Sequence, residues 1–250
     1  MTDECQINST GSRALSQLMS ARHSCRAFLS DPVSVELQRW ILECAQRSAS
    51  WCNAQPWQVH ITQGQATDRF RDLMLCAADT TESDPDFAFP TAYEGVYRQR
   101  RFDCAMQLYD SVKVDRGDRV ASARQARENF RLFGAPHVAL ITSDARLGVY
   151  GALDCGAFVA NFLLAAASVG VATIPQAALA TRPRLVREFF GLDGDRWVVC
   201  GISFGYEDRD HPANQFRTQR ANVKDVASFV WRKEASVAAC RGRWSIECHP

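Results

Sequence analysis

Residues 151–175 read GALDCGAFVANFLLAAASVGVATIP, a long apolar run followed by a short one. The first part has the length of a helix, and Gly170 is the residue type that commonly follows a helix C-terminus. Val171–Ile174 then has the length of a strand, which Pro175 stops. Because Asn161 interrupts the run and no basic flanks border it, we interpret it as a core helix and not as a membrane span.

The rest of the chain alternates between helical and strand spacing. Ser34 is a plausible N-cap for the first helix that this spacing predicts. Helical spacing predicts helices over residues 35–47, 65–78, 97–110, 116–132, 151–169 and 184–190. Strand patterns occupy residues 57–62, 138–142, 171–174 and 197–204. This order predicts one α+β domain with a charged helical excursion, or lid, over residues 80–132.

The composition is that of an ordinary folded protein. Hydrophobic residues make up 46% of the 250 residues, charged residues 23%, and the formal net charge is +1. So small a charge provides no global field for nucleic acid, and we interpret Arg98, Arg100 and Arg101 as a solvated face of the excursion. The N-terminus shows no basic segment followed by an apolar core, so we expect no secretory signal and a cytoplasmic protein.

The chain contains ten cysteines and five histidines. No two cysteines are spaced as C-x-x-C, and the histidines form no paired ligand pattern, so we predict no metal site. Scattered cysteines without a secretory signal are typical of reduced thiols in the cytosol. Cys44, Cys155 and Cys200 lie in apolar stretches, where a free cysteine packs as a small hydrophobic residue.

Residues 22–28 read RHSCRAF and form the first polar motif. In an extended segment, the side chains of Arg22, Ser24 and Arg26 would point to the same side. Guanidinium groups and a hydroxyl are donors that suit phosphate. The residues therefore predict an anion clamp, although an exposed basic stretch is an equal alternative.

Residues 50–57 read SWCNAQPW and form the second motif, a loop between a helix and a strand. Asn53 and Gln55 each combine a donor with an acceptor, as the polar edge of a flat heterocycle does. The loop could meet such a ligand. The alternative is that both side chains only stabilise their own backbone.

The pair R-x-S-x-R-x-F and S-x-x-N-x-Q-P-W resembles the start of the flavin-dependent nitroreductase family. Further counterparts follow in the family's order, at residues 133–136, 154–170, 173–177, 200–206 and 214–220. The resemblance covers residues 15–232 and is nearest to the branch that includes nitrobenzoate reductases. It implies a single α+β domain of nitroreductase-like fold, with a central mixed or antiparallel sheet flanked by helices. Residues 1–14 and 233–250 would be terminal extensions.

The resemblance also implies a homodimer that holds FMN without a covalent bond at the subunit interface. Arg22, His23 and Ser24 match residues that bind the FMN phosphate and ribityl chain, and Arg26 matches one near the pyrimidine end. Ser50, Trp51 and Asn53 match a loop that contacts the flavin of the partner subunit. Pro175, Gln176 and Ala177 match the segment near flavin N5, and Arg217 and Arg220 match basic residues that complete the phosphate site.

The activity implied by the resemblance is a two-step hydride transfer. NAD(P)H would reduce the flavin and leave, and a small organic acceptor, most simply a nitroaromatic compound, would then take the electrons. No side chain is expected to act as a catalytic acid or base, because the cofactor carries the chemistry. Alternatives are dehalogenation, flavin fragmentation or azoline oxidation on the same fold, or a flavin-binding protein without turnover.

Three residues depart from the family's common pattern. Trp51 is bulkier than the small residue frequent at its position, which bears on the size of the acceptor. Cys25 and Cys52 fall inside the two motifs, and a thiolate beside Arg26 would be a physically reasonable redox sensor. Packing is the simpler interpretation of both thiols.

Overall fold

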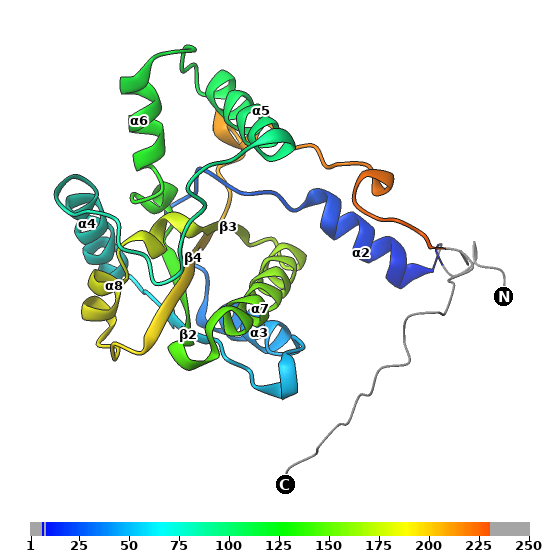
Figure 1. Ribbon diagram of the computed structural model, residues 1–250, viewed down its shortest axis with the longest axis horizontal. Coiled ribbons are helices and arrows are strands. Elements are labelled where there is room, and N and C mark those ends of the chain that lie inside the picture. Colours follow the sequence, from blue (N-terminus) through cyan, green and yellow to red (C-terminus); the bar gives the residue numbers. More distant parts are fainter. Residues whose placement is uncertain (1–6, 8, 231–250) are drawn as a thin grey trace, which may run out of the picture. The chain divides into compact units, whose positions relative to one another are not determined.

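A computed structural model of the chain describes residue 7 and residues 9–230 (Figure 1). By internal contacts the chain divides into residues 1–217 and 218–250. All the helices and strands below belong to the first unit. The helices are α2 (Thr10–Ala21), α3 (Val35–Ala45), α4 (Gln65–Thr80), α5 (Gly95–Ser111), α6 (Arg119–Arg127), α7 (Gly148–Ser168) and α8 (Pro183–Phe190). The strands are β1 (Gln58–Ile61), β2 (His137–Asp144), β3 (Ala172–Gln176) and β4 (Arg196–Gly205).

The four strands form one antiparallel sheet in the order β1-β2-β4-β3. The long strands β2 and β4 occupy the centre, with His137 opposite Phe204 and a register shift between Ile141 and Thr142. Strand β3 lies at an edge, where Gln176 is opposite Gly201. The predicted α+β fold with a central mixed or antiparallel sheet flanked by helices is confirmed, and the sheet is antiparallel.

Helices cover both faces of the sheet (Figure 1). On one face, α3 and α7 pack on alternate residues of β2, Ala139 and Ile141. On the other face, α4 and α8 pack on the residues between them, Val138 and Leu140. Because successive side chains of a strand point to opposite faces, the apolar strand β2 contributes residues to the hydrophobic core on each face of the sheet.

Most predicted elements begin and end near the expected residues. Helix α3 starts at Val35, and the Ser34 hydroxyl accepts a hydrogen bond from the amide of Leu37 (3.3 Å). Helix α8 ends at Phe190, and Gly191 directly after it has the left-handed conformation that glycine tolerates best. The prediction of a core helix over residues 151–169 is confirmed by α7, which starts three residues earlier.

One expected helix was too long, and one helix was not expected. The helix expected over residues 116–132 is limited to α6, because the chain leaves helical geometry after it, and Leu132 and Phe133 have φ angles of 58° and 52°. Helix α2 was not expected. It carries apolar residues at helical spacing, Leu15, Leu18 and Met19, but it buries no residue in one chain, and Leu15 and Met19 are exposed.

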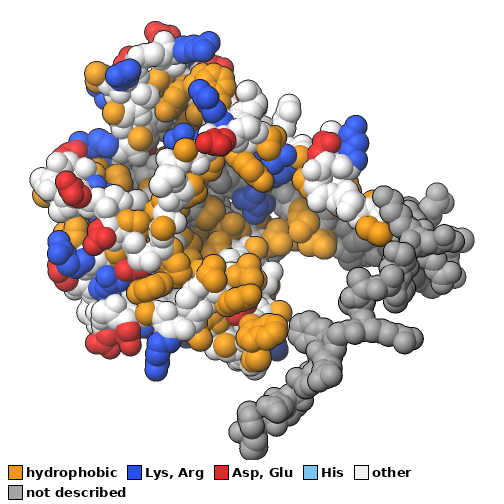
Figure 2. Space-filling model, in the orientation of Figure 1, with side chains coloured by type: hydrophobic (Ala, Val, Ile, Leu, Met, Phe, Trp, Pro, Cys, Tyr) orange, Lys and Arg blue, Asp and Glu red, His pale blue; other side chains and the backbone are white. Residues whose placement is uncertain are grey.

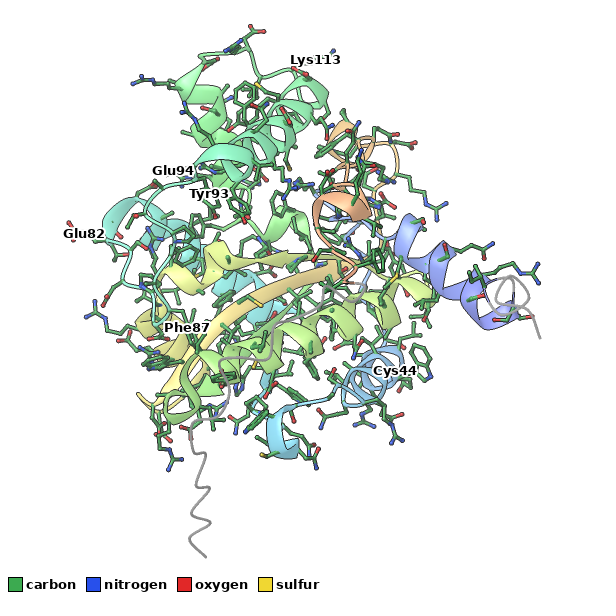
Figure 3. All side chains as sticks on the ribbon, turned by 45° about the vertical axis from the view of Figure 1, so that its right-hand side comes forward. Cys44, Glu82, Phe87, Tyr93, Glu94 and Lys113 are labelled. Carbon is green, nitrogen blue, oxygen red and sulfur yellow. The ribbon has the colours of Figure 1, made fainter. Side chains whose placement is uncertain are left out.

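The link between α4 and α5 is fastened to the body of the molecule. The carboxylate of Asp86 accepts hydrogen bonds from the Arg187 guanidinium and from the backbone amide of Val198, both at 2.7 Å. Phe87 packs edge-on against Trp197, beside the start of β4 (Figure 3). The excursion that holds α5 and α6 is therefore anchored at its first residues.

Arg182 closes the end of α4. Its guanidinium donates to the carbonyl oxygens of Ala77 (2.9 Å) and Thr81 (3.0 Å), which lie at the helix C-terminus. The same group lies 5.2 Å from the ring centroid of Phe130. A cation there adds a hydrogen-bond donor at the helix C-terminus, where the helix dipole favours positive charge.

By length and composition alone, the segment Ala145–Ser168, which includes α7, could cross a membrane. A single such helix is weak support for a membrane protein, since a core helix meets the same criterion. One face of α7 packs into the core through Phe158 and Phe162, which are 1% exposed. This packing accounts for the apolar composition of that face.

Candidate functional site

The first polar motif lies along the edge of the sheet at β3. Ser24 forms an isolated parallel bridge with Thr173, and the amide of Cys25 donates to the Thr173 carbonyl (3.0 Å). Farther on, Phe28 forms an antiparallel bridge with Glu207. Backbone pairing therefore holds residues 22–28 extended and next to the segment that ends at Gln176.

Asn214 connects Arg26 to Arg217. Its side-chain oxygen accepts a hydrogen bond from the Arg26 amide (2.7 Å), and its side-chain nitrogen donates to the Ala27 carbonyl (3.0 Å). The guanidinium of Arg217 donates to the carbonyl oxygen of Asn214 (2.6 Å). Because Asn214 is almost fully buried, two predicted site residues that are far apart in sequence are fixed near each other.

The guanidinium of Arg26 is held by neutral groups. It donates to the Ser24 carbonyl (3.1 Å) and lies 5.2 Å from the ring centroid of Phe216. Burial lowers the pKa of Arg26 from its ordinary value, and the nearby thiols Cys104 and Cys25 act in the opposite direction. No ion pair of Arg26 with an acidic group occurs among the described residues. This cation is therefore available to stabilise a negative charge on a ligand.

Arg22 and His23 border a different cavity from Arg26. They line a cavity of about 470 Å³ between α2 and the C-terminal end of α7, whereas Arg26 lines a larger one. His23 Nε2 lies 2.9 Å from Glu207 Oε1. The segment is extended, as predicted, but within one chain Arg22 and Arg26 do not border one common cavity.

The segment of Pro175, Gln176 and Ala177 ends β3. The Gln176 side chain is buried: its oxygen accepts a hydrogen bond from the Ser203 hydroxyl, and its nitrogen donates to the Asn129 carbonyl (2.8 Å). Asn129 was not among the predicted site residues. It lies in an irregular turn after α6, where no periodic pattern marks it.

The second motif lies near the other end of α7. The backbone amide of Trp51 donates to the Asp154 carboxylate (3.1 Å), whereas the cavity beside Arg22 is lined by Ala167 of the same helix. These two α7 residues are about 20 Å apart along the helix axis. Ser50, Trp51 and Asn53 are therefore not brought to the first motif within one chain.

The second motif forms a strained and exposed loop. Cys52, Asn53 and Gln55 have φ angles of 50°, 57° and 46°, which residues other than glycine seldom adopt. The Ser50 hydroxyl accepts a hydrogen bond from the Gln55 amide (3.0 Å), and the Trp51 side chain is 74% exposed. The loop thus presents a large aromatic ring to its surroundings.

The exposed face of α7 is apolar near the same loop. Val149 is 73% exposed, Tyr150 65% and Leu153 66%, and the exposed Gly156 and Ala160 continue the stripe at helical spacing. Figure 2 shows hydrophobic side chains gathered over this side of the molecule. We call Val149, Tyr150, Leu153, Gly156, Ala157 and Ala160 the α7 stripe. Its small residues would allow another backbone to approach closely, and a patch of this kind is typical of an interface.

The thiols in the core have a structural role. Cys25 is buried and donates to the Ala27 carbonyl (3.0 Å), and burial raises its pKa to about 12. Burial also raises the pKa of Cys155 and of Cys200 to about 12. The idea of a reactive Cys25 thiolate beside Arg26 was wrong, because burial outweighs the attraction of the guanidinium. Among the described residues, no cluster of acidic, histidine or cysteine side chains could hold a metal.

Known proteins resemble this chain over most of its length. The family model described as "Nitroreductase family" matches residues 19–206. The chain is 32% identical to 4-nitrobenzoate reductase of Pseudomonas putida, over 85% of this chain and 94% of the relative. It is 31% identical to nitroreductase NfnB of Mycolicibacterium smegmatis, over 87% and 93%.

A solved structure gives the same result. The crystal structure of the FMN-dependent nitroreductase NfnB from Mycobacterium smegmatis, in complex with NADPH, superposes with a TM-score of 0.84. The two chains are 31% identical, and the match covers 88% of this chain and 99% of that one. Both the sequence and the arrangement of its elements therefore show that this chain is a member of the nitroreductase family.

Proposed function

We propose that the protein is an FMN-dependent oxidoreductase that uses NAD(P)H to reduce a small nitroaromatic acceptor, in two half-reactions at one site. Family membership supports a redox activity of this class. The curated relatives include 4-nitrobenzoate reductases, and a similar solved structure is described as FMN-dependent and in complex with NADPH. A cytoplasmic location goes with this proposal.

The donor set at the edge of β3 fits a flavin nucleotide. Arg26 supplies a cation without an acidic partner among the described residues, and the buried amide of Gln176 lies at the end of the same strand. A positive charge there would stabilise the anion that develops at the pyrimidine end of a reduced flavin. When bound, FMN would supply the hydride chemistry, and the chain would bind, orient and shield it. The proposed contacts are Arg22, His23, Ser24, Arg26, Ser50, Trp51, Asn53, Pro175, Gln176, Ala177, Arg217 and Arg220.

A second copy of the chain is needed to complete this site. Trp51 and its loop lie about 20 Å along α7 from the first motif, too far to contact the same flavin. The loop and the α7 stripe are both exposed in one chain. We propose that two copies pack through the α7 stripe, and that each then presents its Trp51 loop to the flavin held by the other.

The observation that carries the proposal is the buried Asn214, which fixes Arg26 and Arg217 beside β3. The first test is the absorbance spectrum of the purified protein, which should show bound flavin. NADPH should bleach that flavin without air, and a nitroarene should restore the colour. Reoxidation by iodotyrosine instead would favour dehalogenation, and flavin that no nicotinamide reduces would favour a protein without turnover.

The phosphate contacts can be tested by mutation. Replacing Arg22 and Arg220 with alanine should release FMN, since the phosphate would lose two charge-assisted partners, and retention after desalting should fall at least tenfold. Arg39→Ala, an exposed change on α3, is the matched control. A double variant that stays yellow contradicts the phosphate site, and a colourless wild-type protein that FMN cannot reconstitute contradicts the whole proposal.

A further inference from the structure

A cavity with a volume of about 1060 Å³ lies beside α6. Its walls come from the start of α4, the link from α5 to α6, α6 itself, the turn into β2, and the segments around residues 26–32 and 208–211. We call it the basic pocket, because five of its lining side chains are cationic: Arg26, Arg71, Lys113, Arg124 and Arg131. The proposed flavin contacts use only Arg26 of these five.

Two of the five cations are already occupied. The guanidinium of Arg71 pairs with Asp68 (2.6 Å) and also donates to the carbonyl oxygens of Arg131 (3.1 Å) and Ala135 (2.9 Å). Arg131 lies 3.5 Å from the carboxylate of Glu128, one turn earlier. These two residues mainly hold the pocket wall together.

Lys113 and Arg124 are not neutralised in this way. Neither side chain makes an ion pair with an acidic group elsewhere in residues 9–230. Figure 3 shows Lys113 where the chain leaves α5, and Arg124 faces the same pocket from α6. A large cavity with unpaired cations on its wall is a site for an anionic ligand.

The basic pocket borders the proposed flavin site. Glu128 and Arg131 line the pocket, while Asn129, between them, accepts the hydrogen bond from Gln176. Arg26 also belongs to both places. The end of β3 and the pocket are therefore neighbours, on either side of residues 128–131, and Arg26 borders the pocket.

We propose that the basic pocket binds the phosphorylated adenosine half of NADPH, with Lys113 and Arg124 contacting the 2′-phosphate. This inference rests on the proposed function, since it takes NADPH as the electron donor. The volume favours a nucleotide over the carboxylate of a nitrobenzoate, because about 1060 Å³ is far more space than one benzene ring requires. The pocket would make the enzyme prefer NADPH to NADH.

Binding of a nucleotide fragment tests the pocket without any turnover. Adenosine 2′,5′-bisphosphate should bind to the FMN-loaded protein at least tenfold more tightly than 5′-AMP. Lys113→Gln combined with Arg124→Gln should remove most of that difference, because exposed charge pairs contribute severalfold in affinity each. Arg39→Gln on α3 is the matched control for one lost charge. Equal binding of the two fragments to the wild-type protein would overturn the inference.

Flavin reduction gives a second readout. The double variant should lose about tenfold in the rate constant for bleaching by NADPH at low concentration, with the rate for NADH changed less than twofold. An equal loss for both nucleotides, no loss, or a wild-type enzyme that prefers NADH would overturn the inference. The inference would also be overturned if the double variant lost only the reoxidation of its flavin by 4-nitrobenzoate, because the pocket would then bind the acceptor. Failure of both nucleotides to reduce wild-type flavin would instead contradict the proposed function, while the fragment titration would still test the pocket.

Discussion

Helices α7 and α5 are both long, yet they are held in different ways. Helix α7 has 21 residues and buries seven of them, including Phe158 and Phe162, against the sheet and α3. Helix α5 has 17 residues and buries none. The body around α7 is therefore specified by continuous apolar packing, whereas the excursion with α5 depends on a few polar and aromatic anchors. This comparison separates a part of the chain that is held by the hydrophobic core from a part that is held by a few surface contacts.

Removing a core ring from α7 should have the largest effect on folding. Phe162 is 1% exposed and packs edge-on against Phe204 of β4, with ring centroids 5.8 Å apart. Phe162→Ala leaves a cavity in a closely packed core, so we expect the free energy of unfolding to fall by about 4 kcal/mol. Urea denaturation measures this change. Phe102→Ala on α5, where the ring is 44% exposed, is the control, and an equal loss there would remove the distinction between the two helices.

The next largest effect should come from the anchor of the excursion. Asp86 and Arg187 form an ion pair at 2.7 Å, with side chains 9% and 17% exposed. Asp86→Ala leaves the Arg187 cation and the Val198 amide without their shared acceptor, so we expect a loss of about 3 kcal/mol. Limited proteolysis should also cleave the link near residues 81–94 faster than in the wild type. Glu82→Ala, in the same link, is the control.

An unchanged denaturation midpoint for Asp86→Ala would show that the anchor is not needed. A loss of stability without faster cleavage in the link would place the effect in β4 and α8, where Arg187 and Val198 lie, and not in the excursion.

The same contrast explains what the sequence alone could predict. The apolar residues on either side of Gly170 predict a buried helix followed by a strand, and the structure contains α7 and β3 at these positions. Helix α2 was not predicted although Leu15, Leu18 and Met19 stand at helical spacing, because it buries nothing in one chain. The helix predicted over residues 116–132 is too long because α6 ends at Arg127, and Leu132 and Phe133 take left-handed conformations that their residue types do not signal. Local pattern is informative where packing selects the residues, and much less so elsewhere.

For the candidate site, motifs predicted residues but not their arrangement. Residues 22–28 and Gln176 are brought together by backbone pairing, which a motif in the right order allows one to expect. The roles of Asn129 and Asn214 come from single side-chain hydrogen bonds in irregular segments. No periodicity encodes such contacts, and the separation of the Trp51 loop from Arg26 could not be seen without coordinates.

A pair of tyrosines sharpens the comparison at the surface. Tyr150 of α7 and Tyr97 of α5 are both 65% exposed in one chain. If two copies pack through the α7 stripe, Tyr150→Ser should weaken the dimer about tenfold, because a buried aromatic anchor is lost, and should release FMN on dilution. Tyr97→Ser is the matched control and should change neither. Sedimentation at several protein concentrations measures the dissociation constant of the dimer. Equal dissociation constants for the two variants would contradict the proposed interface.

A smaller effect is expected at His137, where the chain returns from the excursion to the sheet. This side chain is 1% exposed, and its Nε2 accepts a hydrogen bond from the Val33 amide (3.0 Å), while Nδ1–H donates to the Thr62 carbonyl (3.1 Å). Only the neutral ring can make both bonds. Burial lowers the pKa of His137 below its ordinary value of 6.5, and the bond to Thr62 offsets this in part.

Because this pKa is lower in the folded than in the unfolded protein, the unfolded state binds more protons below about pH 6.5. The stability that His137 contributes is therefore complete above that pH and is lost as the pH falls. Protonation of His137 breaks the hydrogen bond from the Val33 amide, and we expect this to lower the free energy of unfolding by about 1 kcal/mol. His137→Gln cannot titrate, so its unfolding free energy should fall less steeply between about pH 7 and pH 5 than that of the wild type. If the unfolding free energies of the wild type and of His137→Gln fall equally as the pH decreases, His137 does not cause the loss. The loss would then come from His60, whose pKa is also lowered by burial, or from the carboxylates.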